Sequence, residues 1–205
     1  MPTGPRVLHF DVTVDRAGDA RSALGGSTLP REVEWWAEHL VLAGLVRCTL
    51  ASMSSRLFTE VREKRGLGYY VHAGNTAYTD AGTFYASAGV DVARVDEAIT
   101  TILGELRKIA DEPVPADELE KARGYANGRF VLRLESPQGT IQYGLRREVL
   151  EGEIEEPDEL LQRLDEVTVE DVQRVARELF EDKRLYLALV GPFDDPARFE
   201  KLLAA

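Results

Sequence analysis

The chain is poor in the residues that build redox centres, metal centres and membrane spans. It contains one cysteine and three histidines among 205 residues. The single cysteine, Cys48, cannot form a disulfide within the chain, which suits a reducing compartment. The longest apolar run, residues 40–46, is far shorter than the roughly 20 residues that cross a bilayer. The first residues contain no apolar segment typical of a signal peptide, so we expect a cytoplasmic protein with no membrane partner.

Basic residues are also in deficit. The chain has 25 lysines and arginines against 36 aspartates and glutamates, which gives a net charge of −11. Nucleic acids bind basic surfaces, so this composition argues against a nucleic-acid partner. A hydrophobic share of 44% is ordinary for a protein with a sizeable core. The length favours a single domain over residues 1–205.

The order of the apolar patterns predicts an α+β fold. Residues 7–14 alternate as in a strand with one buried face, residues 69–78 and 82–90 follow as two strands, and residues 185–190 indicate a buried strand. The strands cluster rather than alternate with helices, so we predict a mostly antiparallel sheet of about four strands covered by helices. We expect the first strand to join this sheet. The expected helices are 31–50, 54–65, 93–110, 116–134, 137–150, 157–164, 168–180 and 196–203.

The segment 54–71 predicts a helix that ends at a glycine and leads directly into a strand. Gly66 fits the position after a helix end, where a positive φ is common. Aromatic and β-branched residues then begin the strand. Such a corner would place Arg62 near the helix end and Tyr69, seven residues later, near the strand start. We expect these two side chains to face the same space.

No complete metal site is visible in the sequence. Residues 35–39 fall one residue short of the zinc motif H-x-x-E-H, because Trp35 stands where the motif has its first histidine. A catalytic zinc needs three protein ligands, and Glu38 with His39 supplies too few. We therefore interpret this segment as an ordinary helix with a partly exposed histidine, and we assign no metal ligand and no catalytic residue.

Cys48 suggests a second kind of function, thiol redox chemistry. Arg47 beside it would lower the pKa of the thiol and favour the thiolate that a redox protein needs. The apolar helix around Cys48 favours instead a buried structural thiol. No second cysteine is present to resolve an oxidised intermediate. A thiol-dependent redox protein that uses Cys48 is therefore an alternative and not the main interpretation.

Arg62 and Tyr69 suit the handling of a peptide bond. A guanidinium fork and a phenol hydroxyl can hold a carbonyl oxygen and stabilise the negative charge that it gains under attack. The same two residue types also occur together on ordinary surfaces, with the arginine in a salt bridge and the tyrosine half-buried. The residue types alone leave both interpretations open.

Several short segments form one recognisable pattern. They are MSSRLFTEVREKRGLGY at 53–69, TDAG at 79–82, AGV at 88–90, ELEKARG at 118–124, LES at 134–136, VTVEDV at 167–172 and VGP at 190–192. Together they resemble the second, non-zinc domain of pitrilysin/insulinase-type metallopeptidases, the inverzincin group that includes the mitochondrial processing peptidases. The match covers about residues 53–192. Residues 7–52 keep the family's order of strand, connection and helix, with Leu50, Ala51 and Ser52 where the family has glycines.

The resemblance implies a role for the corner. In this family one domain carries H-x-x-E-H and zinc, and the second supplies an arginine and, seven residues later, a tyrosine that contact the substrate. Arg62 and Tyr69 match these two positions. The resemblance thus implies a non-catalytic, substrate-binding domain or subunit, inactive alone, that assists peptide hydrolysis by a zinc-bearing partner and has no cofactor of its own. An oligomer is compatible with it. Besides the redox protein, the other alternative is an interaction scaffold with no peptidase role.

Overall fold

The computed structural model describes residues 6–14, 44–49, 56–77, 82–150, 152, 154–180 and 185–203. Its four strands form one antiparallel sheet in the order β2-β3-β1-β4. They are β1 (Arg6–Val14), β2 (Gly68–Ala77), β3 (Gly82–Val90) and β4 (Tyr186–Leu189). The labelled helices are η2 (Phe58–Lys64), η3 (Val92–Arg94), α2 (Val95–Asp111), α3 (Ala116–Leu134), α4 (Pro137–Leu150), α5 (Pro157–Glu166), α6 (Val169–Leu179) and α7 (Ala197–Leu203). The predicted α+β class is confirmed.

The first strand joins the main sheet, as predicted from its alternating pattern. β1 lies between β3 and β4, and its residue Leu8 is paired with Ala88 on one side and with Leu189 on the other. β1 therefore brings together strands that are about 100 residues apart in the sequence. Residues 44–49 are helical and belong to the helix expected over 31–50. The rest of that helix, with Glu38 and His39, and the segment 50–55 lie outside the described residues.

The strand predicted at 185–190 forms as β4, but the prediction that it is buried is wrong. Tyr186 is 54% exposed and Val190 is 68% exposed, while Leu187 and Leu189 are half-buried. The physical reason is the place of β4 at the end of the strand order, where it pairs with β1 alone. A short apolar run is compatible with a central strand or an edge strand, and only the pairing of strands distinguishes them.

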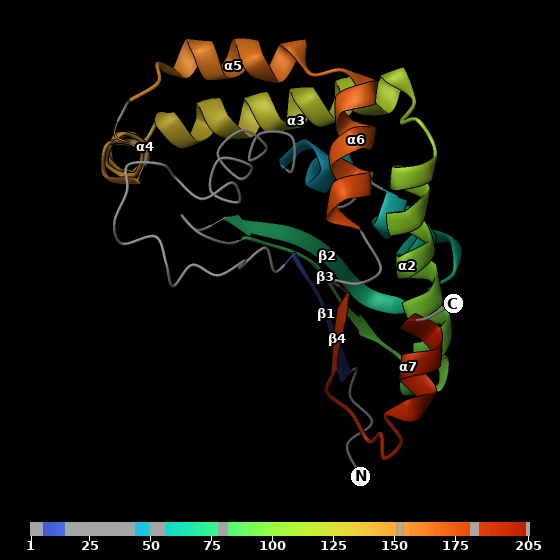
Figure 1. Ribbon diagram of the computed structural model, residues 1–205. Coiled ribbons are helices and arrows are strands. Elements are labelled where there is room, and N and C mark those ends of the chain that lie inside the picture. The colour runs from blue at the N-terminus through green and yellow to red at the C-terminus, as the bar shows by residue number, and fades with distance from the viewer. Residues whose placement is uncertain are drawn as a thin grey trace, which may run out of the picture.

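The core lies between the sheet and a layer of helices. Along β3, Phe84, Ala86, Ala88 and Val90 are alternate residues on one face, and all four are buried. The small side chains let α2 pack closely, and α6 and α7 pack against α2 in turn (Figure 1). The helices α3, α4 and α5 form a second group beyond one end of the sheet. None of the helices among the described residues is long and apolar enough to cross a membrane.

Candidate functional site

The corner begins with a helix of unusual winding. Residues 56 and 57 are α-helical, and η2 continues as a π-helix. Leu57 and Val61 are buried and anchor it to the core. Gly66 ends it with a φ of +57°, the positive value that its position predicted, and its N–H donates to the carbonyl of Arg62 at 3.1 Å. A π-helical turn is rare and is frequent at functional sites.

The strand that follows begins with a β-bulge. Gly68 is paired with Val90 and Tyr70 with Gly89, so Tyr69 is an extra residue without a partner in the ladder. A Cβ atom on Gly68 would lie 2.5 Å from the carbonyl oxygen of Gly89, so only glycine allows this close approach. Bulges change the direction in which side chains point, and they are common beside active sites. Here the bulge leaves the side chain of Tyr69 76% exposed.

The π-helix and the bulge bring Arg62 and Tyr69 together. The guanidinium carbon of Arg62 lies 5.8 Å from the centroid of the Tyr69 ring and 4.9 Å from that of Phe58. Both distances are within the range of cation–π attraction. Arg62 is itself exposed. The two residues therefore do face one space, as predicted from the corner.

Arg62 differs from the cations around it. Lys64 pairs with Glu60 at 2.6 Å, and Arg65 lies 3.9 Å from both Glu60 and Glu97. Within the part of the chain that the structure describes, Arg62 has no carboxylate partner and the Tyr69 hydroxyl has no hydrogen bond. A guanidinium carries five N–H donors and a phenol carries one O–H donor. Their donors are therefore available to a ligand.

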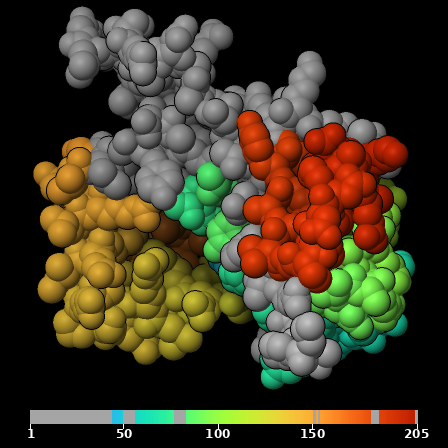
Figure 2. Space-filling view, turned by 90° about the horizontal axis from the view of Figure 1, so that it is seen from below, coloured from blue at the N-terminus to red at the C-terminus, as the bar shows by residue number. Residues whose placement is uncertain are grey.

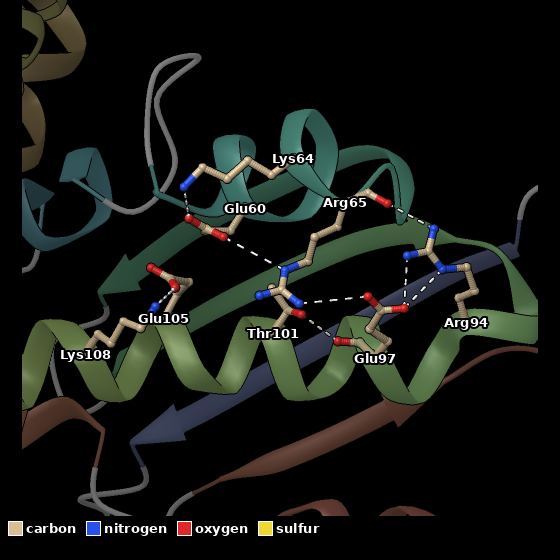
Figure 3. Close-up of polar contacts among 8 residues, drawn as sticks. All are labelled: Glu60, Lys64, Arg65, Arg94, Glu97, Thr101, Glu105 and Lys108. Atoms are coloured by element: carbon tan, nitrogen blue, oxygen red, sulfur yellow. Dashed lines mark hydrogen bonds and ion pairs between the residues drawn. The ribbon is translucent and has the colours of Figure 1, made fainter.

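A network of polar contacts fixes the end of the corner to α2 (Figure 3). Arg94 donates from Nη1 to the carbonyl of Arg65 at 2.9 Å and pairs with Glu97 at 2.9 Å. Glu60 and Glu97 in turn face Arg65 from two elements. Each exposed ion pair contributes at most about 1 kcal/mol. Together the pairs hold the backbone that presents Arg62 and Tyr69.

The pair between Lys64 and Glu60 predicts a pH effect. The hydrogen bond from Lys64 lowers the pKa of the Glu60 carboxyl. A carboxyl whose pKa is lower in the folded than in the unfolded state stabilises the fold above its unfolded pKa, and that contribution is lost as the pH falls through the folded pKa. We expect Glu60→Gln to lower the free energy of unfolding by about 0.5 kcal/mol at pH 7 and by progressively less below about pH 4. Urea denaturation at several pH values measures this.

The matched control is Glu200→Gln, which removes an exposed carboxylate with no ion pair among the described residues. We expect little change in the free energy of unfolding for this variant at any pH. A Glu60→Gln cost that stayed constant from pH 7 to pH 3 would show that the carboxylate charge is not what stabilises the corner.

The structure places Cys48 apart from this site. Cys48 is 2% exposed, and Arg47 donates from Nη2 to its sulfur at 3.6 Å. Burial raises the pKa of the Cys48 thiol, and this outweighs the opposing effect of Arg47 and Arg129. Arg47 does favour the thiolate, as expected, but desolvation of the anion is the larger effect. The buried structural thiol is the better interpretation.

The two histidines at described positions, His9 and His72, belong to no group that could hold a metal ion. His72 is exposed on β2, with its ring 6.0 Å from that of Tyr85, and His9 lies in β1 opposite Ser87. His39 lies outside the described residues. Among the residues with described positions, no group of three or more His, Cys, Asp or Glu side chains could hold a metal ion.

Reasoning from the sequence missed two features of the site. The π-helical winding of η2 has no simple sequence signal, since its apolar spacing also fits an ordinary helix. The bulge did have a signal: a glycine followed by two tyrosines at 68–70, where strict alternation cannot place both rings on one face.

Comparison with known proteins points to one family. Residues 23–124 match the family model described as the Peptidase M16 inactive domain. A protein from Streptomyces coelicolor that bears the name uncharacterized zinc protease is 36% identical over 143 residues, which are 70% of this chain and 31% of that protein. The chain spans about a third of the length of the curated relatives it matches.

Solved structures share the fold across nearly the whole chain. A peptidase M16 inactive domain from Pseudomonas fluorescens superposes with a TM-score of 0.73 at 18% identity and covers 95% of this chain and 42% of its own. An inactive peptidase domain from Bordetella parapertussis gives a TM-score of 0.71 at 18% identity and covers 96% of this chain and 97% of its own. At this identity the likeness concerns the fold.

Proposed function

Because this chain belongs to the family of M16 inactive peptidase domains, as its sequence pattern predicted, we propose that it binds peptide at Arg62 and Tyr69 and assists hydrolysis by a zinc-bearing partner. An inactive domain has no zinc of its own, so the zinc belongs to the catalytic partner. We further propose that residues 1–205 act as one domain in the cytoplasm. The observation that carries the proposal is the contact of Arg62 with Tyr69, both exposed and both with free donors.

Arg62 and Tyr69 would act on the carbonyl oxygen of the bond to be cut. The water that attacks this bond would be activated by a zinc ion held by the partner and not by this chain. Arg62 would donate from its guanidinium N–H groups, and Tyr69 from its hydroxyl, to the oxygen on which negative charge develops. The bulge, the π-helix and the ion pairs of Arg65 fix the backbone that carries both side chains, which limits the reorganisation needed during the reaction. Preorganised donors of this kind stabilise a transition state more than a ground state.

Reconstitution tests the proposal. The chain is combined with the H-x-x-E-H polypeptide that is encoded beside it or fused to it, and cleavage of a quenched fluorescent peptide library is followed. We expect cleavage by the combination and no cleavage by either component alone. Zinc measured in the purified components should be found in the partner. Cleavage by the isolated chain with bound stoichiometric zinc, or partner activity that does not depend on the chain, would overturn the proposal.

A further inference from the structure

A cavity of about 660 Å³ lies away from the corner, between α3, α4, α5, the helix 44–49 and the far end of β2. Figure 2 shows this side of the molecule hollowed between the yellow α3, the orange α4 and the green strands opposite. Arg62 and Tyr69 do not line it. Among the described residues, its lining includes four arginines and no aspartate or glutamate: Arg47, Arg129, Arg133 and Arg147. This concentration of positive charge stands out in a chain with a net charge of −11.

Three of these arginines lack a counter-charge. Arg147 pairs with Glu155 at 2.7 Å and is thereby neutralised. Arg47, Arg129 and Arg133 make no ion pair with any carboxylate in the described ranges of the chain. Arg129 and Arg133 are four residues apart on α3, so their charges repel each other across one helical turn. A bound anion would relieve that repulsion.

Arg47 and Arg129 line the cavity from two elements. Arg47 lies on the helix 44–49 and donates to the Cys48 sulfur at 3.6 Å. Arg129 lies on α3 together with Arg133, and Cys48 is also part of the cavity wall. Guanidinium groups that line one cavity can hold the two oxygens of a carboxylate.

The remaining lining is largely apolar. Leu45 is fully buried, Leu160 and Leu164 are nearly so, and Phe130 is half-buried. Leu132, which is 64% exposed, and the accessible part of Phe130 present apolar surface that a small inorganic anion would not cover. An anionic group attached to an apolar body would contact both kinds of surface. The cavity volume falls within the range of about 300–1,000 Å³ that is common for ligand sites.

We propose that this cavity binds an acidic peptide segment, with a carboxylate held by Arg47, Arg129 and Arg133 and an adjacent apolar side chain against Phe130 and the leucines of α5. The carboxylate can come from an acidic side chain or from a peptide C-terminus, since both offer the same two oxygens. The site is independent of the corner, so it does not depend on the peptidase role proposed above.

Fluorescence anisotropy with the full chain tests this site. The probe is an amino-terminally labelled hexapeptide of alternating leucine and glutamate, and its matched partner has glutamine in place of each glutamate. We expect the glutamate peptide to bind at least about tenfold more tightly, with affinity that falls as salt is raised. Versions with a free and with an amidated C-terminus distinguish the two sources of the carboxylate. Equal binding of the glutamate and glutamine peptides would overturn the proposal.

Paired variants locate the binding. The double variant Arg129→Gln with Arg133→Gln should lose at least about tenfold in affinity for the glutamate peptide. The control, Arg174→Gln with Arg198→Gln, removes the same charge outside the cavity and should retain it. Equal losses in the two double variants would show a general electrostatic effect and no site. Competition by millimolar inorganic phosphate that is as strong as that of the unlabelled peptide would show that the apolar lining makes no contribution, which would also contradict the proposal.

Discussion

Replacing Arg62 by alanine is expected to lower kcat/KM for peptide cleavage by the reconstituted complex about 100-fold. The substitution removes the guanidinium that the corner would present to the carbonyl oxygen of the substrate. No nearby cation among the described residues is free to take its place, because Lys64 and Arg65 are already paired. The loss should fall mainly on kcat, since the charge on the oxygen develops in the transition state. Steady-state kinetics with a single quenched peptide measures it.

Matched variants separate this effect from general damage. Arg62→Lys keeps the charge but not the planar fork and should recover only part of the activity. Tyr69→Phe should cost about tenfold, since it removes one donor to the same oxygen. Arg174→Ala and Tyr186→Phe alter exposed residues elsewhere and should leave kcat/KM unchanged. Arg62→Ala should leave the free energy of unfolding unchanged, because the Arg62 side chain is exposed.

The combined variant Arg62→Ala with Tyr69→Phe decides between two roles for the chain. We expect it to bind the partner normally and to support almost no cleavage. Unchanged cleavage would exclude a role of the corner in substrate handling and would favour the interaction scaffold. Partner binding is followed separately by analytical ultracentrifugation, so that a loss of assembly is not mistaken for a loss of chemistry.

Phe84→Ala is expected to lower the free energy of unfolding by about 3–5 kcal/mol. Phe84 is fully buried on the helix-covered face of the sheet, and its ring packs edge-to-face on Phe180 with centroids 5.1 Å apart. Truncation removes the buried ring and leaves a cavity that a sheet cannot easily close. A loss of this size is large against the 5–15 kcal/mol that typically stabilises a domain. Urea denaturation followed by circular dichroism measures it.

Two control variants should lower the free energy of unfolding by less than Phe84→Ala does. Phe84→Leu keeps most of the buried volume and should cost about 1–2 kcal/mol. Val190→Ala lies on an exposed position after the edge strand and should cost less than about 0.5 kcal/mol. A Phe84→Ala cost as small as that of Val190→Ala would contradict the packing of β3 against the helices.

The elements best predicted from sequence are those with local signals. α3 covers Ala116–Leu134 and α4 begins at Pro137, because prolines mark where a helix can begin and where the one before it must end. Thr168 and Asp171 form a reciprocal capping box at the start of the helix that was predicted over 168–180. Gly66 has the positive φ expected after a helix end. Each of these features depends on residues within one turn of each other.

Features that depend on distant partners could not be predicted in this way. β4 contains a run of apolar residues, yet it lies at the sheet edge because β1 occupies the adjacent position. The arginines of the cavity come from the helix 44–49, α3 and α4. Only packing shows that they line one cavity and that three of them have no carboxylate partner among the described residues. The local pattern of residues determines neither the pairing of strands nor the burial of side chains.

The structure of the corner depends both on local sequence signals and on tertiary packing. Residue order alone placed Arg62 at the end of a helix, Tyr69 at the start of a strand and Gly66 between them, because propensity, capping and backbone sterics act over a few residues. The tertiary structure decided that the helix is π-wound and that Tyr69 is the bulged residue, because both depend on how Leu57, Val61 and the neighbouring strand β3 fit the core. Local sterics fix the elements, and the fit between distant surfaces fixes the direction of the side chains.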